Sequence, residues 1–314
     1  MFRFPNRPVA GMLPGAIRRN VFALWSGEQM LKSTIRKAAR TLRRWVEDPN
    51  GPVDSWAAPY TLNSIYSKIM DRPGCDHDYA WGVMQGVNLA KVLGLTRVSV
   101  IEFGVAGGNG LLTLERIAET AESIFGVNVD VFGFDTGTGL PKPKDYRDMP
   151  NVWSEGFFPM DVEKLKSQLK RAQLVLGPVG ETVRKFTGST PSPVAFIGFD
   201  LDLYTSTRDA FGIFEADQRR LLPRVYCYFD DIMGFTFGDH VGERLAISEF
   251  TASHDLRKLS PIYGLEHYVP RRFANRWWGK YYMAHIFDHE SYGTYDGTIG
   301  GSGVCDLSAP WRAR

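Results

Sequence analysis

The sequence has few cysteines and no long apolar run. Its three cysteines, Cys75, Cys227 and Cys305, are far apart and show no C-x-x-C spacing, so we expect a reducing, cytoplasmic protein rather than a disulfide framework. Cys227 lies in an apolar strand and is interpreted as a small core residue. No stretch approaches the roughly eighteen apolar residues that a transmembrane helix needs. Arginine and proline also interrupt the N-terminus where a signal peptide would have its apolar core.

The sequence also lacks a large excess of either charge. The formal net charge is +2, from 37 lysines and arginines against 35 acidic residues. Residues 1–47 hold ten Lys/Arg and two Asp/Glu, a net +8, which leaves the remaining chain at −6. A mildly acidic main body argues against nucleic acid as a partner. The 44% hydrophobic and 23% charged residues are typical of a folded enzyme rather than a disordered chain.

The positive charge is concentrated in an N-terminal extension. Residues 1–26 are irregular, and residues 27–47 have the spacing of a basic amphipathic helix that ends at the DPNGP sequence. We expect its apolar stripe to pack on the core or on a sister subunit. We also expect the protein to be a homo-oligomer. Peripheral contact of 27–47 with an anionic membrane surface is the alternative. The expected organisation is a basic arm and helix over 1–60, a main domain over 61–290 and a Gly/Ser-rich tail over 291–314.

Strand and helix patterns alternate along the main domain. Apolar runs without clean alternation, such as VAFIGF, indicate parallel strands that are covered on both faces. The predicted fold is therefore α/β, with a doubly wound, mostly parallel, Rossmann-like sheet. We expect strands over 98–103, 129–134, 173–177, 194–200, 224–230 and 280–289, and helices over 78–95, 111–123, 163–172, 206–222 and 243–254.

The first strand, 98–103, leads into a glycine-rich turn. It ends near Glu102, and Gly104, Gly107, Gly108 and Gly110 follow before the next helix. Such a turn lets the backbone approach a ligand at the start of a helix. The spacing does not fit G-x-G-x-x-G, which argues against NAD and leaves another adenosine-containing cofactor.

The second strand ends at Asp135, where a carboxylate is placed to accept hydrogen bonds from ribose hydroxyls. Together, IEFGVAGGNG and FGFDTGTGLP resemble motifs I and II of the class I S-adenosylmethionine (SAM) methyltransferases. The second motif is similar to the G-F-D-[ST]-x-x-G-L-P segment of the macrocin O-methyltransferase family. The resemblance continues through PVAFIGFDLDLYTSTRDA and RVYCYFDDIMG, and covers roughly residues 98–250. One departure is F-D-L-D-L-Y, where family members often have D-G-D-x-Y.

The resemblance implies a SAM site built from the ends of the first three strands. Glu102 would secure the methionine end of the cofactor, and Asp135 would hold the ribose. Gly177, after the short third strand, would border the adenine. The full expected cofactor-binding set is Glu102, Phe103, Gly104, Val105, Gly107, Asp135, Thr136 and Gly177.

Two pairs of aspartates follow the next two strands. Asp200 and Asp202 come at the end of one strand, and Asp230 and Asp231 at the end of its expected neighbour. Four carboxylates at one sheet edge need a positive partner, and Mg²⁺ or another divalent cation suits an all-oxygen site. A simpler interpretation is that Asp202 caps the helix that begins near Thr205.

The family resemblance assigns separate roles to these aspartates. It places the metal ligands on Asp200, Asp230 and Asp231, and the general base on Asp202. His240 is the alternative base, whereas Trp277 and Trp278 are interpreted as packing residues rather than a sugar platform.

The resulting prediction is an enzyme, a SAM-dependent and divalent-metal-dependent O-methyltransferase. Its acceptor would be a hydroxyl of a sugar or a glycosylated natural product, a small molecule or glycan. Two alternatives stay open. One is a metal-dependent nucleotide-sugar glycosyltransferase that uses Asp200-Leu201-Asp202 as a D-x-D motif, and the other is a non-catalytic binding protein with a nucleotide-binding fold.

Overall fold

The computed structural model describes residues 77–189, 192–234, 237–265 and 276–294. These residues all belong to the second of two units, Met1–Pro52 and Val53–Arg314. The predicted basic helix over 27–47, the boundary at residue 60 and residues 295–314 of the predicted tail lie outside the described residues. Within the described ranges, no helix has both the length and the apolar character needed to cross a membrane.

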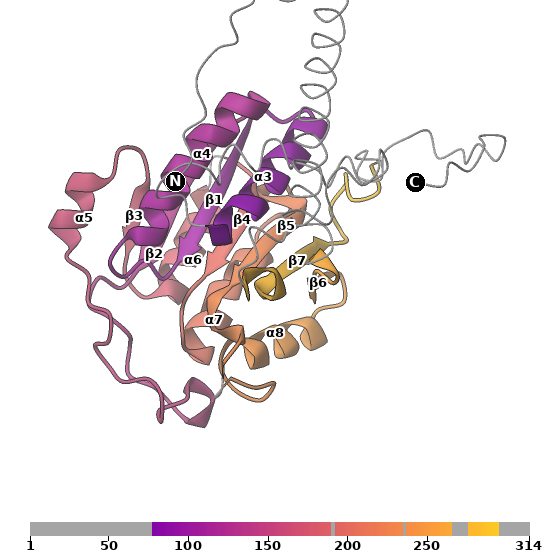
Figure 1. Ribbon diagram of the computed structural model, residues 1–314. Helices are drawn as coiled ribbons and strands as arrows, with labels where there is room; N and C mark the ends of the chain where they lie inside the picture. The colour runs from indigo at the N-terminus through magenta and orange to yellow at the C-terminus, as the bar shows by residue number, and fades with distance from the viewer. Residues whose placement is uncertain (1–76, 190–191, 235–236, 266–275, 295–314) are drawn as a thin grey trace, which may run out of the picture. The chain divides into compact units, whose positions relative to one another are not determined.

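A seven-stranded sheet forms the centre of the described unit, in the order β3-β2-β1-β4-β5-β7-β6 (Figure 1). The first five strands are parallel, and β7 runs antiparallel to both β5 and β6. The predicted doubly wound, mostly parallel Rossmann-like sheet is therefore confirmed. The strands are β1 (Arg97–Phe103), β2 (Asn128–Asp135), β3 (Gln173–Leu176), β4 (Val194–Phe199), β5 (Leu221–Phe229), β6 (Arg257–Pro261) and β7 (Tyr281–Ile286).

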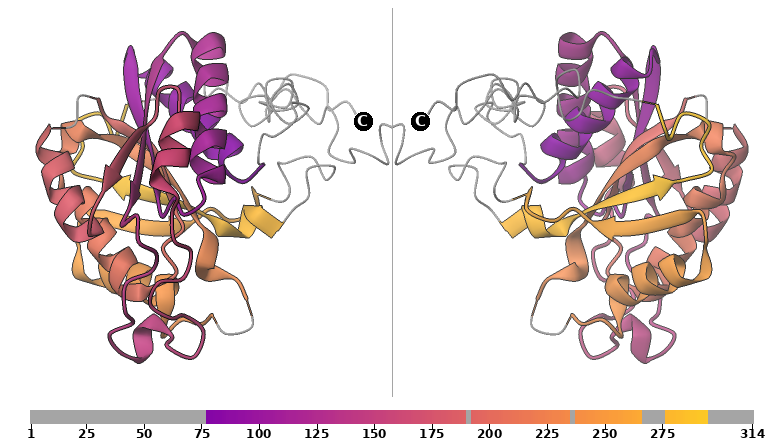
Figure 2. Two further views of the ribbon diagram at one scale, coloured as in Figure 1. Left: turned by 90° about the vertical axis from the view of Figure 1, so that its left-hand side faces the viewer. Right: turned by 90° about the vertical axis from the view of Figure 1, so that its right-hand side faces the viewer.

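Helices cover both faces of this sheet (Figure 2). On one face α3 and α4 contact each other and the central strands, and on the other α7 contacts both α6 and α8. The helices are α3 (His77–Val92), α4 (Asn109–Phe125), α5 (Val162–Gln168), α6 (Val179–Ser189), α7 (Tyr204–Ala210) and α8 (Gly242–Ser253). Because helices cover both faces, the central strands are buried on both sides. Every residue of β4, and every residue of β1 except Arg97, is buried.

A row of four phenylalanines crosses the sheet near the carboxyl ends of its parallel strands. Phe103 is in register with Phe134 and Phe199, and Phe199 with Phe229. Their ring centroids lie 4.9, 5.4 and 4.6 Å apart in the order Phe134, Phe103, Phe199, Phe229. Each such aromatic contact contributes about 0.5–1.5 kcal/mol beyond the burial of its area. The row forms a rigid apolar floor directly beneath the edge where the predicted site residues lie.

Three elements differ from the sequence-based expectation. The helix expected over 206–222 ends at Ala210, and short 3₁₀ turns and the start of β5 occupy the remainder. Helix α6 was not predicted, because Gly180 and Gly188 lower its helical propensity. Strand β6 was not predicted either, since Leu259 is its single fully buried residue and gives no apolar run.

Candidate functional site

A cavity of about 610 Å³ opens at the carboxyl edge of the parallel strands. This is the edge at which open α/β sheets bind ligands. Its lining comes from the ends of β1, β2, β4 and β5, from the start of α6, and from the long connection between β2 and α5. The predicted site residues in the lining are Gly104, Asp135, Thr136, Gly177, Asp200, Asp202, Asp230 and Asp231.

The glycine turn allows the ends of β1 and β4 to approach each other. Gly104 has a φ of 83°, and a Cβ atom there would lie 1.7 Å from the carbonyl oxygen of Asp200. Only glycine tolerates both the conformation and the contact. The Asp200 N–H donates to the Phe103 carbonyl at 2.8 Å, which joins the two strand ends. Gly104 therefore brings the predicted cofactor turn next to the first predicted metal ligand.

Glu102 lies beneath this turn and is 2% exposed. Its Oε1 accepts a hydrogen bond of 2.9 Å from the hydroxyl of Tyr79 on α3, and its Oε2 is buried without a hydrogen-bond partner. Burial raises the pKa of Glu102 well above its usual range. An unpartnered buried acceptor is costly, so it calls for a donor that the described part of the chain does not supply. Phe103 and Val105 are also buried, whereas Gly107 is exposed.

Asp135 joins the glycine turn to the loop that follows β2. Its Oδ2 accepts the N–H groups of Val105 and Ala106 at 2.9 and 3.0 Å, and its Oδ1 accepts the Gly137 N–H at 2.6 Å. Each carboxylate oxygen can accept more than one hydrogen bond, so Asp135 keeps acceptor capacity toward the cavity. Its neighbour Thr136 donates to the Gly139 carbonyl at 2.8 Å, which fixes the same loop.

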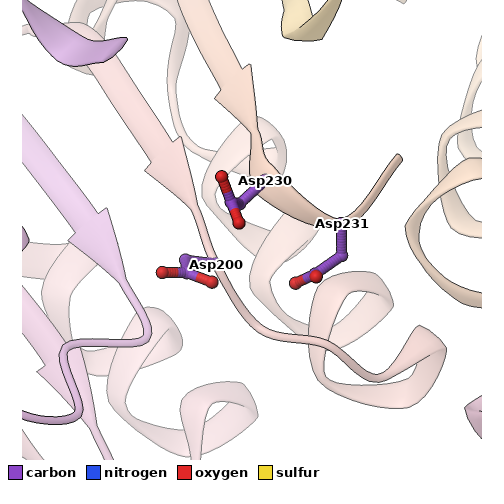
Figure 3. A group of neighbouring side chains, drawn as sticks. All are labelled: Asp200, Asp230 and Asp231. Atoms are coloured by element: carbon purple, nitrogen blue, oxygen red, sulfur yellow. The ribbon is translucent and has the colours of Figure 1, made fainter. Parts of the chain in front are cut away.

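Three carboxylates meet where β4 and β5 end (Figure 3). Asp200, Asp230 and Asp231 each offer one carboxylate oxygen, and these atoms all lie within 4.8 Å of one another. Asp200 is exposed, Asp230 is half-buried and Asp231 is buried. The structure thus brings together the three predicted metal ligands, and their all-oxygen donor set fits a hard divalent cation.

Crowding and burial hold the carboxyls of Asp200 and Asp231 toward their neutral forms. Although Asp200 is exposed as a whole residue, desolvation of its carboxyl within the cavity, followed by the charges of Asp231 and Asp230, raises its pKa to about 8. Burial and the charges of Asp202 and Asp230 raise the pKa of Asp231 to about 8. A positively charged ligand would reverse both effects, because it favours the ionised form.

Asp202 lies in the turn between β4 and α7. It is 8% exposed, and its φ of 60° shows that the strand geometry does not persist beyond Phe199. Its N–H donates to Asp231 Oδ2 at 3.1 Å. Burial, followed by the charge of Asp200, raises the pKa of its carboxyl to about 7.

The interpretation of Asp202 as a helix cap is wrong. Helix α7 begins after Leu203, which makes no side-chain cap. The buried Asp148, from the connection between β2 and α5, instead accepts the Thr205 N–H at 2.8 Å and the Thr205 hydroxyl at 3.1 Å. Asp148 therefore supplies the capping interaction, and the Asp202 carboxylate is left for the cavity.

We call Asp200, Asp230 and Asp231 the acidic centre. Residues that the sequence analysis did not single out surround it. Lys280 Nζ lies 2.7 Å from Asp230 Oδ1, and the Tyr228 hydroxyl lies 2.9 Å from the same oxygen. Glu243 is fully buried, and its Oε2 accepts the Asp231 N–H at 3.0 Å. Lys280 opens the predicted last strand. The sequence signal for Lys280 is its place at the start of this strand, because a strand antiparallel to β5 begins at the edge where β5 ends.

His240, the predicted alternative base, is exposed and is not among the lining residues of this cavity. Trp278 is half-buried and packs against the hydrophobic core. The tryptophan that does line the cavity is Trp153, which the sequence analysis did not select. Its ring stacks on Phe237 and meets Phe158 edge-on, with centroids 6.4 and 6.1 Å away.

Comparisons with known proteins give structural likenesses only. Neither the protein-family models nor the curated proteins contain a match. Among solved structures, the calicheamicin methyltransferase CalS11 is 22% identical with a TM-score of 0.44, covering 73% of this chain and 88% of that one. An O-methyltransferase from Bacillus cereus in complex with SAH is 14% identical with a TM-score of 0.35, covering 78% and 97%.

A third solved structure is the O-methyltransferase TomG from Streptomyces achromogenes in complex with SAM. It is 12% identical with a TM-score of 0.37, and the match covers 74% of this chain and 90% of that one. These likenesses add no argument about the site of this chain. The order of its own strands, with β7 antiparallel at the β5 edge, gives the chain a doubly wound, Rossmann-like fold.

Proposed function

We propose that this protein is a SAM-dependent, divalent-metal-dependent O-methyltransferase that methylates a hydroxyl of a sugar or a glycosylated natural product. One observation carries the proposal. The carboxylates of Asp200, Asp230 and Asp231 converge in the same cavity that the glycine turn and Asp135 line. A cofactor pocket and a cation site that share one space are what metal-assisted transfer to a hydroxyl requires.

The residues at the ends of β1, β2 and β3 fit the cofactor. The unpartnered Oε2 of Glu102 calls for a donor, and the ammonium group of SAM would provide one. Gly104 lines the cavity and lets the turn lie against the end of β4, where a side chain would clash with the Asp200 carbonyl. Asp135 and Thr136 would face the ribose, and Gly177 would border the adenine.

Asp200, Asp230 and Asp231 would hold the divalent cation. When bound, it would supply Lewis acidity that lowers the pKa of the acceptor hydroxyl. Asp231 is already oriented for this task, since its Oδ2 accepts the Asp202 N–H and its own N–H donates to Glu243. These two bonds support the proposal, because they hold Asp231 in place when no cation is bound.

Asp202 would accept the proton of the acceptor hydroxyl at its carboxylate. Its backbone is tied to Asp231, so its side chain stays beside the cation site. Burial and Asp200 raise its pKa to about 7 when no cation is present. A bound cation would lower this pKa and keep the carboxylate ionised, the form that accepts a proton. His240 would take this role only if Asp202 proved dispensable.

The connection between β2 and α5 would form the acceptor wall, defined here as residues 140–158. Its Trp153, Phe157 and Phe158 line the cavity, and the two phenylalanines are 44% and 50% exposed. Phe158 has a φ of 58°, a conformation that costs a bulky residue about 1–2 kcal/mol. Exposed rings held in this way offer flat apolar surfaces to the non-reacting part of an acceptor.

Binding and turnover together test the proposal. Calorimetry should show that the protein binds SAM. A separate titration with a nucleotide sugar should show no binding. Release of SAH over a panel of glycosides should require Mg²⁺ and stop on addition of EDTA, which should leave SAM bound. Asp230→Asn should abolish turnover. Asp217→Asn should not, because Asp217 is exposed, caps a 3₁₀ turn and is not among the cavity-lining residues.

Two results would contradict the proposal. Full activity in EDTA would eliminate the metal mechanism. If the protein binds the nucleotide sugar but does not bind SAM, the result would instead favour a glycosyltransferase that uses Asp200 and Asp202.

A further inference from the structure

Lys280 is a resident cation at the acidic centre. It is the last residue of the 3₁₀ turn Arg276–Lys280 and directly precedes β7. Because β7 runs antiparallel to β5 with Tyr281 opposite Tyr228, it starts at the edge where β5 ends. Lys280 Nζ thereby reaches Asp230 Oδ1 at 2.7 Å, with a side chain that is 17% exposed.

The contacts of Asp230 divide its carboxylate into two sides. Oδ1 faces Lys280 and the hydroxyl of Tyr228, at 2.7 and 2.9 Å. No hydrogen bond to Oδ2 occurs among the described residues. Lys280 and Tyr228 thus hold Asp230 through one of its two oxygens.

The ammonium group also changes the charge that an incoming cation meets. Its positive charge, within ion-pair distance of Asp230, offsets one unit of the negative charge that Asp200, Asp230 and Asp231 carry when they are ionised. A divalent cation bound by Asp230 would lie close to this ammonium, and like charges repel strongly in a partly buried site. Lys280 and the divalent cation therefore compete for the charge of the same carboxylate.

We propose that Lys280 is a positioning residue that orients Asp230 and, as a resident counter-cation, weakens the affinity of the acidic centre for divalent metal. The inference rests on the metal site of the proposed function. It adds that the metal binds reversibly. In the metal-free protein, Lys280 compensates part of the negative charge of the carboxylates. A divalent cation must bind against the electrostatic repulsion of the Lys280 ammonium group.

The test measures metal binding alone, with the full chain and without SAM or acceptor. Mg²⁺ is titrated by calorimetry and Mn²⁺ by electron paramagnetic resonance, at one fixed, mildly alkaline pH. Lys280→Met removes the charge and the donor, and Lys280→Gln removes the charge but keeps an N–H donor. Lys280→Arg keeps the charge, and Tyr228→Phe removes the other donor to Asp230 without any change of charge. Circular dichroism confirms that each variant is folded.

We expect Lys280→Gln and Lys280→Met to bind both metals at least tenfold more tightly, about 1.4 kcal/mol. Lys280→Arg should match the wild type, and Tyr228→Phe should bind equally or more weakly. A variant that was merely damaged would lose affinity, so tighter binding cannot come from misfolding. If only Lys280→Met failed to fold, Lys280→Gln would carry the comparison.

Unchanged or weaker binding in both neutral variants would overturn the inference and leave the proposed function intact, provided that the wild type binds metal. Binding by a neutral variant but not by the wild type would support the inference in its strongest form. If none of these proteins binds metal, the inference fails together with the metal part of the proposed function. Asp230→Asn, which removes a proposed ligand, provides the matched baseline for that outcome.

Discussion

Asp135 links two loops and faces the cavity with the same carboxylate. Three backbone N–H groups, from Val105, Ala106 and Gly137, donate to it. Its position at the end of β2 was predictable from the sequence, because an apolar run ends there at a carboxylate. Its ties to the glycine turn were not predictable, since they depend on how two loops meet in space.

Replacement of Asp135 by alanine should weaken SAM binding by about 2–4 kcal/mol, the loss of a pair of charge-assisted hydrogen bonds. Calorimetry with SAM measures this loss. Asp135→Asn keeps one side-chain oxygen for the loop N–H groups and should lose less. Unchanged SAM affinity in Asp135→Ala would remove Asp135 from the cofactor site.

Asp202→Asn isolates the proposed base from its neighbours. The bond to Asp231 comes from the backbone N–H of Asp202 and survives the substitution. Asparagine also tolerates the φ of 60° at this position. The variant should therefore bind SAM and metal normally and lose roughly 10²–10⁴-fold in turnover. An active Asp202→Asn enzyme would transfer the base role to a histidine, with His240 the first to test.

At the scale of elements, hydrogen bonds hold the acceptor wall in two places. Its two ends are joined, because the Leu140 N–H donates to the Phe157 carbonyl and the Gly156 N–H donates to the Leu140 carbonyl, both at 2.8 Å. Farther along, the buried Asp148 caps α7 through Thr205. The wall is therefore a preorganised element, although it contains little regular secondary structure.

Phe158→Asn should remove the exposed ring while keeping a residue that accepts the left-handed backbone. We expect the KM for a glycoside acceptor to rise about tenfold, as for the loss of one aromatic contact. SAM affinity should not change. Tyr146→Ala is the matched control, because Tyr146 is 71% exposed on the same connection but is not among the cavity-lining residues. An equal effect of both variants would contradict the proposed role of the wall.

The sequence predicts elements well where burial imposes one pattern. The parallel strands β1, β2, β4 and β5 are apolar because helices cover both faces, and their predicted ranges agree with the structure to within a few residues. The edge strand β6 and the wall have no such pattern. Lys280 and Asp148 act on residues 50 and 57 positions away, and contacts of that kind depend on the tertiary arrangement rather than on local sequence.

At the scale of the whole molecule, the acidic centre couples stability to pH. The carboxyl of an unfolded aspartate has a pKa of about 3.9, whereas in the fold the pKa of Asp231 is raised to about 8. The folded state thus binds more protons in this window, and its stability falls as the pH rises from about 4 to about 8. Bound metal should offset the loss, because it replaces the protons.

Asp231→Asn should show this coupling in thermal melts of the metal-free protein. The Tm of the variant relative to the wild type should increase as the pH rises through the window, and saturating Mg²⁺ should reduce the difference. Asp217→Asn is the control, because Arg219 lowers the pKa of Asp217 to about 2, so it does not titrate there. A Tm difference that is independent of pH would contradict the coupling.

The cofactor pocket should be independent of the N-terminal arm. Among the residues that the structure describes, those that line the cavity fall between Gly104 and Asp231. Deletion of residues 1–26 should therefore leave SAM affinity unchanged in calorimetry. A truncated protein that folds but no longer binds SAM would show that the arm belongs to the site, and that the predicted domain division is wrong.

The position of β7 between β5 and β6 has a consequence for how the chain assembles. Strand β6 precedes β7 in the sequence but reaches the sheet only through it. During synthesis, the five parallel strands can pair first and leave β5 as an open edge. Strand β6 can then join the sheet only together with β7 or after it. Lys280 arrives with β7, so the acidic centre gains its resident cation only when that strand joins the sheet.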